Sequence, residues 1–88
     1  MVSAKICFIG SRMYYNHYRP MIKIQDNDMY NSCELIFKHR DSVYSGEEIE
    51  VNIIFLVPDL VIDCLYKGKQ FIMYEGPYIV GKGEITSV

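Results

Sequence analysis

The sequence predicts one small all-β domain over residues 1–88, most simply a closed β-barrel, and three observations lead to this prediction. Apolar side chains recur at every second position and not with the helical period. The alternating segments are short and rich in Val, Ile, Tyr and Phe, and turn residues separate them at regular spacing. Eighty-eight residues, half of them hydrophobic, suffice for one core. A sandwich or a barrel fits this spacing.

Seven segments have this strand pattern. The clearest runs from Glu48 to Leu56, where Ile49, Val51, Ile53 and Phe55 share one face. The predicted strands are 2–9, 18–25, 32–38, 48–56, 60–65, 70–74 and 78–86. Residues 59–66 are the one stretch with a helical alternative. We therefore expect six or seven short strands and almost no helix.

Turn chemistry separates these segments. Gly10 ends the first strand, and the Asp-rich segment 26–28 is a turn. Residues 39–46 form a polar loop, and Gly68 marks a further turn. Segment 75–77 (EGP) joins the last two strands as a hairpin. No linker, repeat or domain boundary divides the chain.

The charge is small but unevenly distributed. The formal net charge is −2, which is too low to attract nucleic acid or a membrane surface by itself. Residues 1–44 hold six Lys/Arg and four Asp/Glu, whereas residues 45–88 hold three and seven. The N-terminal half is therefore weakly basic, and a polyanion-binding surface or an ordinary solvated surface both fit it.

Three cysteines, Cys7, Cys33 and Cys64, are odd in number and form no C-x-x-C pair. This set favours reduced thiols in a cytosol over a disulfide framework. The sequence shows no signal-peptide pattern, and no apolar run approaches the ~18 residues that a bilayer span requires. We expect a soluble, cytoplasmic protein without a membrane partner.

Two motifs resemble ligand sites but depart from them. Segment 76–83 (GPYIVGKG) approaches a P-loop, yet Gly83 replaces the Ser or Thr that holds Mg²⁺, and too few residues follow for a helix. No nucleotide is expected; Gly81 and Gly83 instead allow a bulge or close backbone approach within a strand. Segment 26–28 (DND) lacks the later ligands of a calcium loop.

No catalytic or metal site is predicted. His17 and His39 lie in separate segments, without a second histidine at metal-binding spacing. Either one could act with a cysteine, but no oxyanion donors or orienting carboxylate are recognisable. We therefore predict that the chain is not an enzyme and needs no cofactor.

The most informative stretch for binding begins at Arg12. Two arginines bracket three tyrosines and a histidine there, a mixture that suits phosphate contact with base stacking and also protein–protein hot spots. Tyrosines that close one end of the barrel are the third explanation. The candidate partner-binding residues are Arg12, Tyr14, Tyr15, His17, Tyr18, Arg19 and Lys23.

Four blocks in order resemble the third domain of elongation factor Tu, its C-terminal β-barrel. They are Tyr18-Arg19-Pro20 with Asp28 and Glu34-Leu35, segment 43–47 (VYSGE), Pro58, and segment 71–83 (FIMYEGPYIVGKG). The resemblance spans nearly the whole chain. It implies a six-stranded antiparallel Greek-key barrel that is not catalytic and that, in the family, contacts tRNA and other proteins.

Several departures weaken the functional part of the resemblance. The GTPase domain and the second barrel have no counterpart here, so GTP hydrolysis is not implied. Tyr74 and Tyr78 replace arginines of the closing block, and the loop before Tyr18 is shortened. About four extra residues lie between Pro58 and Gly68. Lost arginines weaken phosphate binding directly, because such contacts depend on charge.

Two functions therefore remain open. The first is a non-catalytic binding module acting through protein–protein contacts, with translation components or as a toxin-neutralising (immunity) protein. The second is direct tRNA or RNA binding by the residues from Arg12 to Lys23.

Overall fold

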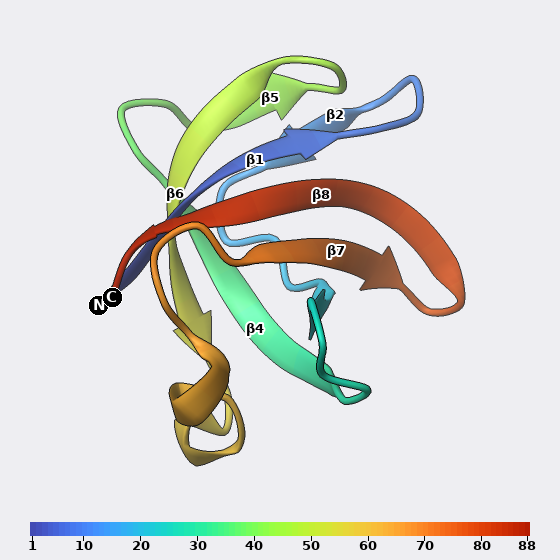
Figure 1. Cartoon of the computed structure of the whole chain (residues 1–88). Coiled ribbons are helices and arrows are strands. Elements are labelled where there is room, and N and C mark those ends of the chain that lie inside the picture. The colour runs from blue at the N-terminus through green and yellow to red at the C-terminus, as the bar shows by residue number, and fades with distance from the viewer.

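Six strands form a closed antiparallel ring in the computed structural model, which describes all 88 residues (Figure 1). The strands are β1 (Val2–Phe8), β3 (Met21–Ile24), β4 (Tyr30–Phe37), β6 (Glu48–Phe55), β7 (Gln70–Glu75) and β8 (Tyr78–Ser87). Their order around the barrel is β1-β6-β4-β3-β7-β8, and β8 pairs with β1 to close it. The predicted six-stranded all-β barrel is confirmed, and the ring has no free edge.

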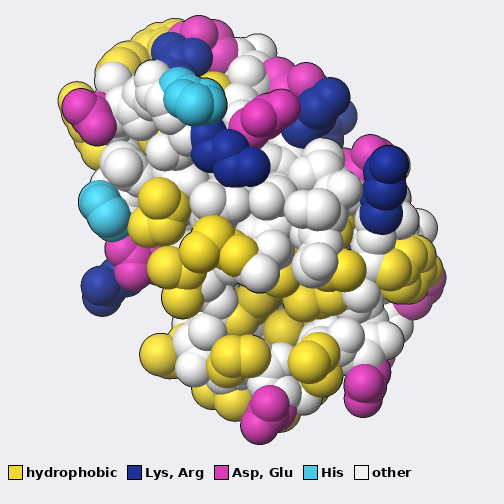
Figure 2. Space-filling model, turned by 90° about the vertical axis from the view of Figure 1, so that its left-hand side faces the viewer, with side chains coloured by type: hydrophobic (Ala, Val, Ile, Leu, Met, Phe, Trp, Pro, Cys, Tyr) yellow, Lys and Arg dark blue, Asp and Glu magenta, His cyan; other side chains and the backbone are white.

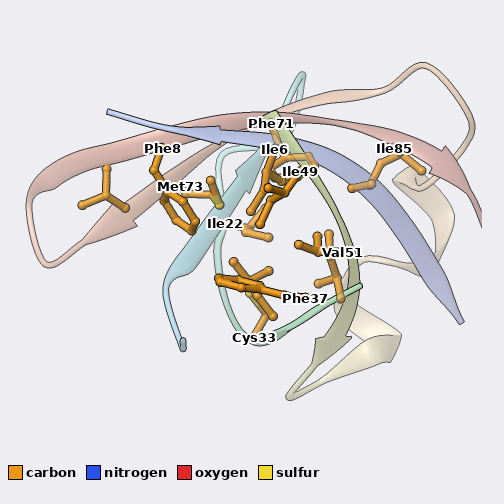
Figure 3. Close-up of a cluster of buried hydrophobic side chains, with 14 of the residues drawn as sticks. Ile6, Phe8, Ile22, Cys33, Phe37, Ile49, Val51, Phe71, Met73 and Ile85 are labelled. Carbon is orange, nitrogen blue, oxygen red and sulfur yellow. The ribbon is translucent and has the colours of Figure 1, made fainter. Parts of the chain in front are cut away.

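The core follows the predicted alternation, because successive side chains of a strand point to opposite faces. Alternate residues of β1 and of β6 are buried, from Ala4 to Phe8 and from Ile49 to Phe55. Figure 3 shows Ile6, Ile22 and Phe71 converging at the centre of the barrel. The core comprises Ala4, Ile6, Phe8, Tyr14, Ile22, Ile24, Cys33, Leu35, Phe37, Val43, Ile49, Val51, Ile53, Phe55, Val61, Phe71, Met73, Val80 and Ile85.

Two glycines let β8 pass close to its neighbours. A Cβ atom on Gly83 would lie 2.3 Å from Cζ of Phe71 and 2.8 Å from Cγ2 of Ile6. One on Gly81 would lie 2.6 Å from Cε of Met73 and 2.7 Å from the carbonyl oxygen of Cys7. The predicted close approach is confirmed. Register shifts on both sides of β8 add the bends that closure requires.

The predicted strand over 60–65 is wrong. The chain there forms two short 3₁₀ turns, η1 (Pro58–Leu60) and η2 (Ile62–Cys64). Pro58 has no N–H for a strand ladder, and the carbonyls of Val57 and Pro58 accept hydrogen bonds from Leu60 and Val61. Only Val61 of this segment is buried. The mostly apolar segment 60–65 therefore contains one buried side chain, and the others are exposed or half-buried.

Two segments expected as loops pair with each other. The strands β2 (Met13–Tyr15) and β5 (Ser42–Tyr44) form a separate two-stranded sheet. Tyr14 lies opposite Val43, and both are buried. The ring of Tyr14 stacks on Phe8 with centroids 3.9 Å apart. Burial of one residue per strand makes this short ribbon form, although each segment has the composition of a loop.

We expect Gly83→Ala to lower the free energy of unfolding by about 1–3 kcal/mol, because the methyl group must displace Phe71 or Ile6 in a filled core. The backbone of Gly83 has no positive φ angle, so the effect comes from space alone. Urea unfolding followed by circular dichroism measures it. Lys82→Ala, at an exposed position of the same strand, is the control and should change stability by less than about 0.5 kcal/mol. Equal midpoints for the two variants would contradict the close-approach argument.

Candidate partner-binding surface

The segment between Arg12 and Arg19 runs along β2 and then beside β4. The Asn16 side-chain oxygen accepts hydrogen bonds from the N–H groups of His17 and Phe37, at 2.9 and 2.8 Å. The His17 N–H also donates to the carbonyl of Leu35 at 3.0 Å. These bonds hold His17 in a left-handed conformation with φ of 72°. The segment therefore has a fixed shape.

Three of the predicted binding residues, Arg12, Tyr14 and Tyr18, contact one another, and two of them, Arg12 and Tyr18, also contact Glu75. The Arg12 guanidinium lies 4.3 Å from the ring centroid of Tyr14 and 6.0 Å from that of Tyr18. Its Nη1 is 3.5 Å from a Glu75 carboxylate oxygen, and the Tyr18 hydroxyl donates to the other at 2.5 Å. Tyr14 is only 2% exposed and donates to the carbonyl of Ile9. These groups fasten β2 to the end of β7.

The cluster shifts the pKa values of two of its members. Partial burial raises the pKa of the Tyr18 hydroxyl well above its usual value, and its hydrogen bond to Glu75 raises it further. The same hydrogen bond lowers the pKa of Glu75, with a smaller contribution from Arg12. The ionised carboxylate is thus the form that the folded state prefers.

The other predicted residues occupy three places. Tyr15 is 64% exposed, on the face of β2 opposite to Tyr14. His17 and Arg19 both approach Glu34, with Nδ1 of His17 at 2.7 Å and Nη2 of Arg19 at 3.8 Å from its oxygens. Lys23 lies apart on the outer face of β3, between Tyr30 and Ile72 on the adjacent strands. The structure therefore brings together two groups of the predicted set and separates Tyr15 and Lys23 from them.

A second surface begins near the end of β6, where the outward-facing side chains change from acidic to apolar. These outward-facing side chains start with Glu48 and Glu50 and end with Ile54. Beyond β6 the chain continues into η1 and η2 with more exposed apolar side chains, including Leu56 at 75% and Ile62 at 63% exposure. We call this the apolar surface; its members are Ile54, Leu56, Val57, Leu60 and Ile62. Figure 2 shows hydrophobic side chains gathered over the lower half of this side of the molecule.

The apolar surface adjoins the ion-paired residues of the predicted site. Glu34 on β4 pairs in register with Ile54 on β6. An open hollow of about 540 Å³ lies beside this pair, lined by Arg19, Ser32, Cys33, Glu34, Ile54, Phe55 and Leu56. His17 and Arg19 therefore form a polar border to the apolar surface, through their shared contact with Glu34.

The sequence does contain a signal for this surface. Residues 53–57 (IIFLV) are apolar without interruption, so both faces of the strand end are apolar. In a barrel strand whose outer face is exposed, alternation should continue. The break marks the side chains that point outward without a partner. The assignment of 60–65 to a strand concealed the rest of the surface.

A larger groove of about 830 Å³ lies over the outer faces of β1, β3, β7 and β8. It contains Lys5, Lys23 and Lys82, but Glu48 and Glu84 line it as well. Mixed charges of this kind give no preference for an anionic or a cationic ligand.

The thiols and the other candidate ligand groups lie apart. All three cysteines are free, and burial raises the pKa of the Cys33 thiol to about 12. No three His, Cys, Asp or Glu side chains lie close enough together to hold a metal ion. None of the helical segments has the length and apolarity needed to cross a membrane.

No protein-family model matches this chain, and no curated protein matches its sequence. Fold and surface thus define its class: a small closed antiparallel β-barrel with an apolar surface beside an ion-paired border.

We expect Tyr18→Phe to lower the free energy of unfolding at pH 7 by about 1 kcal/mol, because the Glu75 carboxylate loses its hydroxyl donor. Glu75 has a lowered pKa, so its stabilising contribution is complete above its ordinary pKa and disappears as the pH falls through the folded-state value. The difference between Tyr18→Phe and wild type should therefore shrink from pH 7 to pH 3 in urea unfolding.

Tyr15→Phe is the control, because that tyrosine is exposed and outside the cluster; its stability should match wild type at both pH values. A Tyr18→Phe effect of unchanged size at pH 3 would assign the loss to packing and not to the hydrogen bond with Glu75.

Proposed function

We propose that this barrel is a non-catalytic binding module that contacts another protein through the apolar surface. The observation that carries the proposal is the exposure of Leu56 and Ile62 on the outside of a barrel whose core is already filled. Contiguous exposed apolar patches on small proteins mark interaction sites. Burying one such side chain in an interface contributes about 1.5–3 kcal/mol.

The polar border supports the same function. A protein interface has an apolar centre surrounded by polar groups whose hydrogen bonds are satisfied. Glu34 meets this description, because it is held by His17 and by Arg19 beside the hollow next to Ile54. Arg19 keeps most of its side chain exposed, which leaves donors free for a partner.

The contacts of the arginines and tyrosines favour a protein over tRNA or RNA. Binding of a single-stranded RNA requires open aromatic faces for stacking and cations free to neutralise phosphates. The face of Tyr14 is covered by Phe8 on one side, and Arg12 lies near that ring. Glu75 pairs with Arg12, and Glu34 lies beside Arg19, so a phosphate at either arginine would also lie near a carboxylate.

The resemblance to the third domain of elongation factor Tu belongs to this proposal. A six-stranded closed antiparallel barrel is the architecture that the resemblance implies, and Gly81 and Gly83 of the closing block stand at the tightest points of β8. On this basis the partner is a component of the translation machinery, or a toxin that the barrel neutralises by binding it in a fixed ratio.

Affinity capture from an extract of the source cells tests the proposal. We expect wild-type barrel to retain one protein at a ratio of about one to one. The double variant Leu56→Ser, Leu60→Ser should lose it, because two exposed anchors are removed without disturbing the core. Tyr78→Ser, at the exposed first residue of β8, is the control and should retain the partner.

Circular dichroism checks that each variant keeps the fold. Retention of the same protein by the double variant, or no retained protein at micromolar concentration, would contradict the proposal. Binding of tRNA at about 50 mM salt, with a steep loss as salt is added, would favour the RNA alternative instead.

A further inference from the structure

We infer that the partner presents a basic segment to the apolar surface: apolar side chains flanked by lysines or arginines. This inference rests on the proposed function and specifies the chemistry of the partner. It is drawn from the distribution of charge around Leu56, Leu60 and Ile62.

The chain segment that forms the apolar surface carries only negative charge, and Arg19 lies at the border. From Ile53 to Tyr66 there are two Asp residues and no Lys or Arg. These two acids, Asp59 and Asp63, lie in η1 and η2, interleaved with Leu60 and Ile62. Both are exposed, and neither forms an ion pair. In Figure 2 the charged side chains at the lower rim of the hydrophobic area are acidic.

Elsewhere on the surface, four of the eleven acids form ion pairs within the chain. Glu34, Glu47 and Glu75 each pair with an arginine. Nζ of Lys69 lies 3.4 Å from a carboxylate oxygen of Asp26 and also donates a hydrogen bond to the Tyr66 hydroxyl. The two aspartates of the apolar surface have no such intramolecular partner. Their charges are available to a cation on another molecule, and an interface that excludes water strengthens that attraction.

The carboxylates of Asp59 and Asp63 disfavour binding of the other molecules that could cover this surface. In a symmetric pair of barrels joined at their apolar surfaces, Asp59 and Asp63 would face their own copies, and like charges placed together disfavour association. RNA and anionic lipid carry negative charge as well. A basic, apolar protein segment is the one occupant that both the apolar side chains and the charges favour.

Two synthetic peptides test this inference as probes. Both are amphipathic 16-mers with leucines at the same positions; one has lysines at its polar positions and the other has glutamates. Fluorescence anisotropy with each labelled peptide gives the affinity at about 50 and 300 mM NaCl, a range over which screening is strong. Amide chemical shifts of the ¹⁵N-labelled barrel locate the binding site.

We expect the lysine peptide to bind at least about tenfold tighter than the glutamate peptide at low salt, with shifts confined to residues 54–63. Asp59→Asn with Asp63→Asn should reduce this preference by about five- to tenfold and flatten its salt dependence. The control, Asp41→Asn with Glu84→Gln, removes two exposed acids elsewhere and should leave the preference unchanged.

The outcomes separate this inference from the proposed function. Equal affinity for both peptides, lost in the Leu56→Ser, Leu60→Ser variant, would overturn the basic partner and leave the apolar surface as a protein-binding site. No binding of either peptide would overturn the inference, while affinity capture remains an independent test of the function. Sedimentation that shows a dimer lost in the same variant would assign the surface to a second copy and overturn the inference too.

Discussion

The closure of the barrel at β8 is the constraint on which the rest of the structure depends. This strand pairs with β7 on one side and with β1 on the other, so every barrel strand has two neighbours. In the closed ring, the side chains of Phe71 and Ile6 fill the space beside Gly83, which has no side chain. A bulkier residue at that point would push β8 outward and open the ring. The two register shifts along β8 supply the curvature that a straight strand lacks.

Closure also explains why the exposed apolar side chains are significant. The interior is filled to the point where even a methyl group at Gly81 or Gly83 finds no space. Leu56 and Ile62 lie outside this filled interior, at 75% and 63% exposure. Their exposure is a property of the finished fold. In a chain this small, apolar groups on the outside reduce solubility unless a partner covers them.

The barrel could be predicted from the sequence because apolar and polar residues alternate along the long strands. Every inward position of β6, from Ile49 to Phe55, could be read from alternation alone. The sheet formed by β2 and β5 could not, because three residues are too few to establish a period. The prediction for segment 60–65 is wrong because a mostly apolar segment of this length is also typical of a buried strand. Length and composition could not distinguish one anchor, Val61, from a fully buried segment.

The candidate site was only partly predictable for a different reason. The composition of segment 12–19 predicts a binding site, but composition does not show which of its charges are paired within the folded chain. Tyr18 and Glu75 are 57 residues apart, and only the closed ring brings them together. A single sequence carries no local signal for such a contact.

The pairing inside the molecule determines where recognition can take place. Arg12 and Tyr18 bind Glu75, and Tyr14 packs against both of them, so a partner that engaged these residues would first have to break contacts that stabilise the barrel. Binding at Asp59 and Asp63 breaks no such contact, because neither aspartate forms an ion pair within the chain. Charges that are unpaired and lie beside exposed apolar groups are free to pair with a binding partner. We therefore propose recognition at the end of β6 and in the two turns that follow it.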